Sequence, residues 1–152
     1  MSNHEPVGRV LLVEDNPADA EMALRAFKQH NLGNQVAWVK DGVEALDYLL
    51  HRGAYEHLTG QPKVVLLDLR LPKLDGIDVL REVRAHEATR ELPIVVLTSS
   101  KEERDVVESY SLGVNSYVAK PVAFKDFAAT IAELGMYWLI MNRVPNEDDT
   151  AS

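Results

Sequence analysis

Five short apolar runs, separated by helix-like patterns, constrain the fold of this chain more than any other feature. Three of them are almost uninterrupted by polar residues, which is typical of strands buried on both faces of a parallel sheet. We therefore predict five strands, and the runs cover Val10–Val13, Val36–Val39, Val64–Leu67, Ile94–Leu97 and Tyr117–Ala119.

The segments between these runs carry apolar residues with helical spacing. After the first run the spacing i, i+3, i+4, i+7 predicts a helix that begins near Pro17, with Asp15 or Asn16 as its cap. Strict alternation of five strands and five helices indicates an α/β fold with a doubly wound parallel sheet. The further predicted helices cover Val43–Leu50, Ile77–Val83, Glu103–Leu112 and an extended C-terminal helix from about Phe124 to Asn142.

The length of 152 residues fits one compact domain. We assign residues 9–142 to this domain, residues 1–8 to an N-terminal tail and residues 143–152 to an acidic C-terminal tail. Gly53–Lys63 is predicted to be a surface loop, and no output domain is expected.

Charge and cysteine content exclude several classes of function. The 16 Lys and Arg residues against 24 Asp and Glu residues leave a net charge of -8, which argues against nucleic acid or an anionic membrane surface as partner. The absence of cysteine excludes a disulfide, a thiol nucleophile and a cysteine-type zinc site. No segment resembles a signal peptide, and the longest strongly apolar run, Met136–Met141, is too short to span a membrane, so we expect a cytoplasmic protein.

Polar side chains gather where the predicted strands end. Glu14 and Asp15 follow the first strand, Asp68 follows the third, and Thr98 and Lys120 follow the fourth and fifth. In open α/β sheets the ligand site lies outside the carboxyl ends of the strands. These five residues therefore converge on one crevice if the first and third strands are neighbours.

Such a cluster of carboxylates needs a cation. Two carboxylates about 5 Å apart, at an effective dielectric constant near 20, repel each other by roughly 3 kcal/mol. Mg²⁺ offsets this repulsion and prefers carboxylate, water and phosphate oxygens. The pattern predicts a metal-assisted phosphoryl acceptor with Asp68 as nucleophile, Lys120 neutralising charge and Thr98 donating a hydrogen bond to the product.

Each of these residues also has a purely structural interpretation. In this interpretation Asp15 caps a helix, Thr98 lies in a turn and Lys120 is a solvated surface residue. For any one residue taken singly, the structural interpretation is as good as the functional one. Asp68 is harder to explain structurally, because a carboxylate directly after a buried strand is costly without a partner. The convergence of all these residues on one edge of the sheet favours the functional interpretation.

Four motifs in combination resemble the receiver domains of two-component response regulators over roughly residues 9–142. The resemblance implies a flavodoxin-like sheet with strand order 2-1-3-4-5. The motifs are VEDNP at Val13–Pro17, LLDLRLPKLDG at Leu66–Gly76, VLTSS at Val96–Ser100 and YVAKP at Tyr117–Pro121.

The resemblance also implies a role for each site residue. Asp68 is the phosphoacceptor, and Mg²⁺ is bound by Asp15 and Asp68, by Glu14 through water and by the backbone carbonyl of Arg70. Arg70 also occupies a position that influences the rate of dephosphorylation. The remaining implied features are a switch pair of Thr98 and Tyr117, a phosphate contact from Lys120, and a cis peptide bond before Pro121.

A narrower resemblance lies at the C-terminus, where LGMYWLIMN resembles single-domain regulators encoded beside hybrid or phytochrome-type histidine kinases. It implies that the partner is a histidine kinase, and bacteriophytochromes are among the candidate kinases. Met136 and Ile140 lie on one face of the predicted helix, away from its core stripe, so we predict a homodimer that includes Met136, Tyr137 and Ile140. The alternative is that these turns fold back over the edge of the sheet.

Two other functional classes stay open. A phosphatase or phosphomutase also forms an aspartyl-phosphate, but its DxD pattern requires an acid where Arg70 stands. A flavodoxin-like FMN-binding module shares the architecture, but its first turn is rich in hydroxyl groups and glycine, whereas this one is acidic. The favoured prediction is a regulator whose only chemistry is its own phosphorylation and dephosphorylation, read out through the surface of helix four, strand five and helix five.

Overall fold

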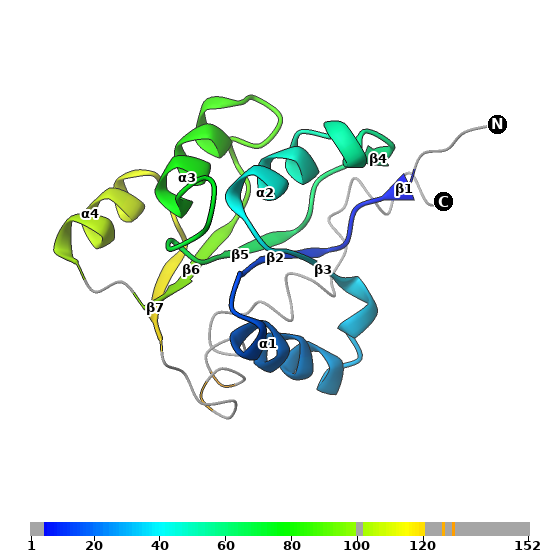
Figure 1. Cartoon of the computed structure of the whole chain (residues 1–152), viewed down its shortest axis with the longest axis horizontal. Helices are drawn as coiled ribbons and strands as arrows, with labels where there is room; N and C mark the ends of the chain where they lie inside the picture. Colours follow the sequence, from blue (N-terminus) through cyan, green and yellow to red (C-terminus); the bar gives the residue numbers. More distant parts are fainter. Residues whose placement is uncertain (1–4, 100–101, 121–125, 127–128, 130–152) are drawn as a thin grey trace.

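The computed structural model describes residues 5–99, 102–120, 126 and 129. The strands of the main sheet alternate with α-helices along this part of the chain (Figure 1). The strands of the main sheet are β2 (Val10–Val13), β3 (Val36–Val39), β5 (Val64–Leu67), β6 (Ile94–Thr98) and β7 (Ser116–Ala119). The helices are α1 (Pro17–Gln29), α2 (Gly42–Leu49), α3 (Gly76–Ala85) and α4 (Glu103–Ser111), with short 3-10 turns at Gly33–Gln35 and Gly53–Tyr55.

All five strands of the main sheet are parallel, in the order β3-β2-β5-β6-β7. Counted along the main sheet alone this is the order 2-1-3-4-5, so the predicted doubly wound, flavodoxin-like architecture is confirmed. Val13 pairs with Leu67, so β2 and β5 end side by side. The residues that follow these two strands are therefore neighbours at the same edge of the sheet.

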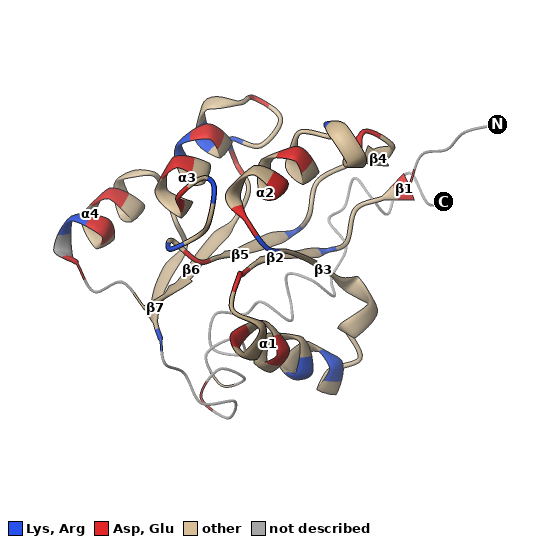
Figure 2. Cartoon of the chain, viewed as in Figure 1, with Lys and Arg blue, Asp and Glu red and all other residues tan. Residues whose placement is uncertain are grey.

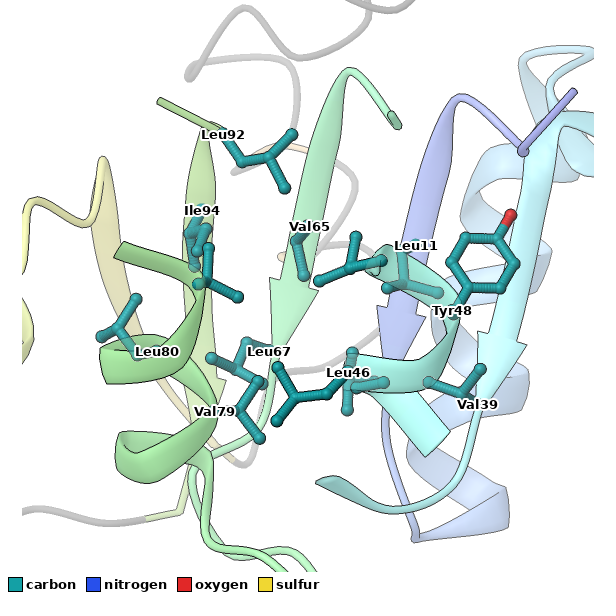
Figure 3. Packing of buried hydrophobic residues seen from close by; sticks show 14 of the residues in the cluster. Leu11, Val39, Leu46, Tyr48, Val65, Leu67, Val79, Leu80, Leu92 and Ile94 are labelled. Carbon is teal, nitrogen blue, oxygen red and sulfur yellow. The ribbon is translucent and has the colours of Figure 1, made fainter. Parts of the chain in front are cut away.

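The core consists of two apolar clusters, one on each face of the sheet. Leu11 and Val13 project towards α2 and α3, whereas Val10 and Leu12 project towards α1. Figure 3 shows strand and helix side chains interdigitating in the first cluster, and the strands of the main sheet carry almost no charge in Figure 2. Because burying each large apolar side chain contributes roughly 1.5 to 3 kcal/mol, the two clusters hold the strand ends in a rigid frame.

At the start of α1, the residue that caps the helix is not the residue that lies at the predicted site. Asn16 is the N-cap residue, and its Oδ1 accepts hydrogen bonds from the N–H groups of Ala18 (2.9 Å) and Asp19 (3.1 Å). Pro17 occupies the first turn, where a missing N–H costs nothing. Of the two caps predicted for this helix, Asn16 is the one used, and Asp15 has an exposed side chain beside the strand ends.

The prediction of an irregular surface loop over Gly53–Lys63 is wrong in part. This segment contains a 3-10 turn and the short strand β4 (Leu58–Thr59), which pairs in parallel with β1 (Glu5–Pro6). Two residues of the segment assigned as an N-terminal tail therefore form a strand. Strands of two residues are too short for hydrophobic alternation to reveal them.

Several sequence predictions lie outside the described residues. They concern the extended C-terminal helix with Met136, Tyr137 and Ile140, the peptide bond before Pro121, and the C-terminal tail. Among the helices of the described ranges, none has both the length and the apolar character that crossing a membrane requires.

Candidate functional site

Three carboxylates gather at the carboxyl ends of β2 and β5. Glu14 and Asp15 follow β2 directly and Asp68 follows β5, so the strand pairing brings them together. One carboxylate oxygen from each residue lies within 4.8 Å of the others. Glu14 is 2% exposed and Asp68 5% exposed, whereas Asp15 is open to solvent. Hard oxygen donors at this spacing suit a divalent cation such as Mg²⁺.

Lys120 reaches this cluster from the end of β7. Its Nζ lies 2.5 Å from Glu14 Oε1, 3.0 Å from Asp68 Oδ2 and 2.9 Å from Asp19 Oδ2, and the residue is 9% exposed. Its backbone N–H donates to the carbonyl of Thr98 at 2.8 Å, which places the ends of β6 and β7 side by side. The three N–H donors of the ammonium group thus meet three carboxylates.

Asp19 belongs to this site although the sequence reasoning missed it. It lies in the first turn of α1, four residues after Asp15. An acidic residue is common in the first turn of a helix, so no local sequence pattern distinguishes Asp19 from an ordinary helix-start residue. Its carboxylate shares Lys120 with the carboxylates of Glu14 and Asp68.

Backbone N–H groups orient the two buried carboxylates. Asp68 Oδ1 accepts from the N–H of Arg70 at 3.1 Å, and Glu14 Oε2 accepts from the N–H of Asn16 at 3.1 Å. Gly76 opens α3 close beneath this loop, and a Cβ there would meet the carbonyl oxygen of Asp68 and the Cα of Leu69. The DG pair of the Leu66–Gly76 motif therefore keeps α3 packed against the Asp68 loop.

Trp38 is a second residue that the sequence reasoning missed. Its indole Nε1 donates a 2.7 Å hydrogen bond to the backbone carbonyl of Glu14. Leu12 and Trp38 are paired in the β2–β3 register, so the contact depends on sheet pairing across 24 residues. No local sequence pattern identifies such a contact. The bond anchors the backbone of the acidic turn to β3.

The predicted switch residues share one face of the sheet. Tyr117 pairs with Val96, and Thr98 follows Val96 by two residues. Because side chains alternate along a strand, Thr98 and Tyr117 project to the same side. Thr98 is fully buried, and Tyr117 is partly buried against the cluster that α2 and α3 cover.

Arg70 extends from the Asp68 loop towards α4. Its Nη2 lies 2.9 Å from Asp105 Oδ2 and 3.2 Å from Glu102 Oε1. The structure therefore places the Arg70 backbone at the site through its N–H, and its guanidinium group against the first turn of α4. The metal contact predicted for its carbonyl stays a prediction.

Burial and charge shift two pKa values in the cluster. Burial raises the pKa of the Glu14 carboxyl group to about 7, although hydrogen bonds from Lys120 and the Asn16 N–H oppose the shift. Burial by itself lowers the pKa of Lys120, but its hydrogen bonds to Glu14 and Asp19 and the charge of Asp68 raise that pKa above its ordinary value. Lys120 is therefore a permanent cation here.

The raised pKa of Glu14 predicts a pH-dependent stability in the absence of divalent cations. The folded protein binds the Glu14 proton more tightly than the unfolded chain does, so this contribution to the free energy of unfolding is lost as the pH rises from about 4.5 to about 7. The expected size is on the order of 1 to 3 kcal/mol.

Urea denaturation at pH 5 and pH 7.5, in the presence of a chelator, measures this effect. Glu14→Gln should be less sensitive to pH than wild type by this amount, because only the wild-type side chain titrates. Equal pH dependence in the two proteins would mean that Glu14 titrates normally.

The described site coincides with a known domain. The family model of the response regulator receiver domain matches residues 10–132, which include every residue of the carboxylate and lysine cluster. The chain belongs to this family. The chain is therefore a receiver domain, which accepts a phosphoryl group in two-component signalling, as the motif resemblance predicted.

Relatives of this receiver domain share most of its length. The probable methanogenesis regulatory protein FilR2 of Methanothrix harundinacea is 47% identical over 137 residues, which cover 90% of this chain and 86% of FilR2. The response regulator Rcp1 of Synechocystis is 37% identical over 130 residues, which cover 86% of this chain and 88% of Rcp1.

Solved structures of response regulators show the same fold. The Mn²⁺-bound form of Rcp1 has a TM-score of 0.77 at 36% identity, covering 90% of this chain and 97% of that one. The phosphorylated cyanobacterial phytochrome response regulator RcpA has a TM-score of 0.78 at 34% identity, covering 93% and 99%. The receiver domain described here is therefore homologous to phytochrome response regulators, and among these relatives Rcp1 binds a divalent metal and RcpA is phosphorylated.

Proposed function

We propose that this receiver domain takes a phosphoryl group from a histidine kinase onto Asp68. The observation that supports this most strongly is the position of the Asp68 carboxylate. This carboxylate is almost buried and accepts hydrogen bonds from Lys120 Nζ and from the Arg70 N–H. It also lies close to the carboxylate oxygens of Glu14 and Asp15. Glu14 is similarly buried and is contacted by Lys120 and by the Asn16 N–H, and it is the motif at Leu66–Gly76 that selects Asp68 as the acceptor.

The proposed reaction is a phosphoryl exchange between two nucleophiles. A carboxylate oxygen of Asp68 attacks the phosphorus atom of a phosphohistidine, the O–P bond forms and the P–N bond breaks. The electron pair of the broken bond stays on the imidazole, which takes a proton from water. Lys120 keeps its charge throughout and neutralises part of the charge that builds up on the transferred group.

The donor set fits Mg²⁺ as the cofactor of this reaction. Asp15 and Asp68 would bind the ion directly, and the carbonyl of Arg70 is the further ligand that the family resemblance implies. Glu14, whose two oxygens contact Lys120 and the Asn16 N–H, would bind the ion through water, as the family resemblance implies. When bound, Mg²⁺ supplies positive charge that offsets the carboxylates and the phosphoryl oxygens.

We propose that Thr98 and Tyr117 convey phosphorylation to the surface of α4, β7 and the helix that the sequence predicts after β7. Their common face of the sheet supports this role, since both lie on the side where α4 packs. The chemistry of the chain is then confined to its own phosphorylation and dephosphorylation, and its output is a change of surface.

For the partner we propose a histidine kinase of the phytochrome type. The likeness to the phytochrome response regulator RcpA supports this choice. The homodimer through Met136, Tyr137 and Ile140 and the cytoplasmic location remain predictions from the sequence.

Incubation with acetyl phosphate and Mg²⁺, followed by intact mass spectrometry, tests the proposed function. We expect a single phosphate adduct that disappears when a chelator replaces Mg²⁺. Folding is checked by circular dichroism on the same sample. A folded protein that gains no adduct, or gains one regardless of Mg²⁺, would contradict the proposal.

A further inference from the structure

Helix α4 is held to the rest of the domain by arginines of the preceding segment. Arg70 pairs with Glu102 and Asp105 at the start of the helix. Arg81, on α3, pairs with Glu108 in its middle at 2.5 Å. At its end, Arg84 donates to the carbonyls of Leu112 (2.7 Å) and Gly113 (2.9 Å). Three guanidinium groups thus hold the helix along its length.

The inner face of α4 is unusually polar for a packed helix. Among the α4 side chains that the structure describes, the buried ones are Asp105 and Ser109, one turn apart, and the Ser109 hydroxyl has no hydrogen-bond partner within the described ranges. The apolar Val107 and Tyr110 are instead 60% and 52% exposed. Figure 2 shows the acidic bands along this helix. Since little apolar surface is buried here, the attachment of α4 depends on charge and is open to change by a new charge nearby.

Among these three arginines, Arg70 also contacts the acceptor. Its N–H donates to Asp68 Oδ1, while its guanidinium group pairs with Asp105 and Glu102. The Arg70 guanidinium group therefore pairs with two carboxylates at the start of α4. Arg70 also lies two residues after Asp68, which gains the phosphoryl group. Phosphorylation adds about one negative charge and three strong acceptor oxygens. Arginine binds such oxygens in a bidentate manner, better than it binds a single carboxylate oxygen.

We propose that Arg70 is a phosphoryl-sensing residue, whose guanidinium group exchanges the carboxylates of α4 for the phosphoryl oxygens on Asp68. The proposal rests on the proposed function, because it needs a phosphoryl group at Asp68. The exchange leaves the buried Asp105 without this partner, close to Glu102 and to the new negative charge. The first turn of α4 then loosens, by a route separate from Thr98 and Tyr117.

Thermodynamic linkage makes the proposal testable. If Asp105 competes with the phosphoryl group for Arg70, removing the charge of Asp105 must strengthen binding of a phosphoryl mimic. We expect Asp105→Asn to bind beryllofluoride about three- to tenfold more tightly than wild type, the size expected for a partly buried ion pair. The affinity is measured by ¹⁹F NMR in the presence of Mg²⁺.

Matched variants separate the exchange from a general charge effect. Glu108→Gln removes the same charge from the same helix but breaks the pair with Arg81, so its affinity should stay at the wild-type value. Asp105→Glu keeps the charge and should also resemble wild type. In the Arg70→Gln background, Asp105→Asn should give no further gain. In wild type, hydrogen exchange of the α4 amides should accelerate on beryllofluoride binding, and in Asp105→Asn it should already be fast.

Each contrary result has a distinct meaning. Suppose that wild type binds beryllofluoride but Asp105→Asn does not raise the affinity, or raises it equally in the Arg70→Gln background. The proposed exchange of Arg70 partners is then wrong, and the acceptor function of Asp68 stands. If folded wild type with Mg²⁺ does not bind beryllofluoride at all, the acceptor function and the exchange both fail.

Discussion

Asp68→Asn should abolish the phosphate adduct completely. The amide has nearly the shape of the carboxylate but lacks the negative charge and the nucleophilic oxygen that attack phosphorus. Lys120 keeps Glu14 and Asp19 as partners, so the fold should survive the substitution. Intact mass after incubation with acetyl phosphate and Mg²⁺ measures the loss, and circular dichroism confirms that the protein is folded.

Asp75→Asn is the matched control for this experiment. Asp75 lies in the same loop and is the N-cap residue of α3, but its side chain makes no capping hydrogen bond. The variant should therefore gain the adduct to the wild-type extent. An adduct that persists in Asp68→Asn would assign the acceptor to another carboxylate of the cluster, with Asp15 as the first to test.

Lys120→Met should give the largest loss of stability. Methionine has a similar length but no charge, so Glu14, Asp19 and Asp68 lose their common cation in a nearly buried site. Removing one partner of a buried ionic cluster costs about 3 to 5 kcal/mol. We expect a decrease of this size in the free energy of unfolding, measured by urea denaturation in the presence of a chelator. The Asp68 nucleophile remains, so the variant should still form an adduct when Mg²⁺ is present.

Added Mg²⁺ should restore part of this lost stability, because a divalent cation also offsets the repulsion among the carboxylates. Lys73→Met serves as the control: this lysine is exposed and pairs with Asp41 at 3.4 Å, so its loss should cost less than about 1 kcal/mol. If both variants lose the same small amount, Lys120 does not stabilise the cluster as its contacts indicate.

The strands of the main sheet and their carboxyl ends were predictable from the sequence by itself, whereas β1 and β4 were not. Apolar runs of four residues match β2, β3 and β5 residue for residue. In β2 and β5 every residue is buried, and a strand buried on both faces must be apolar throughout. The polar residues directly after these runs then had to lie at the carboxyl edge of the sheet. The sequence therefore places Glu14 and Asp68 at this edge, and the motif resemblance adds the strand order that makes them neighbours.

Only the tertiary structure decided how these residues share partners. Lys120 and Glu14 are 106 residues apart, and their contact depends on the register of three strand pairs at once. Asp19 and Trp38 join the site through the packing of α1 and the pairing of β3. The direction of the Arg70 side chain depends on where α4 packs, because its ion-pair partners Glu102 and Asp105 lie at the start of that helix. Local pattern shows which face or end a residue occupies, whereas the distance between two such residues follows from the packing of elements that are remote in sequence.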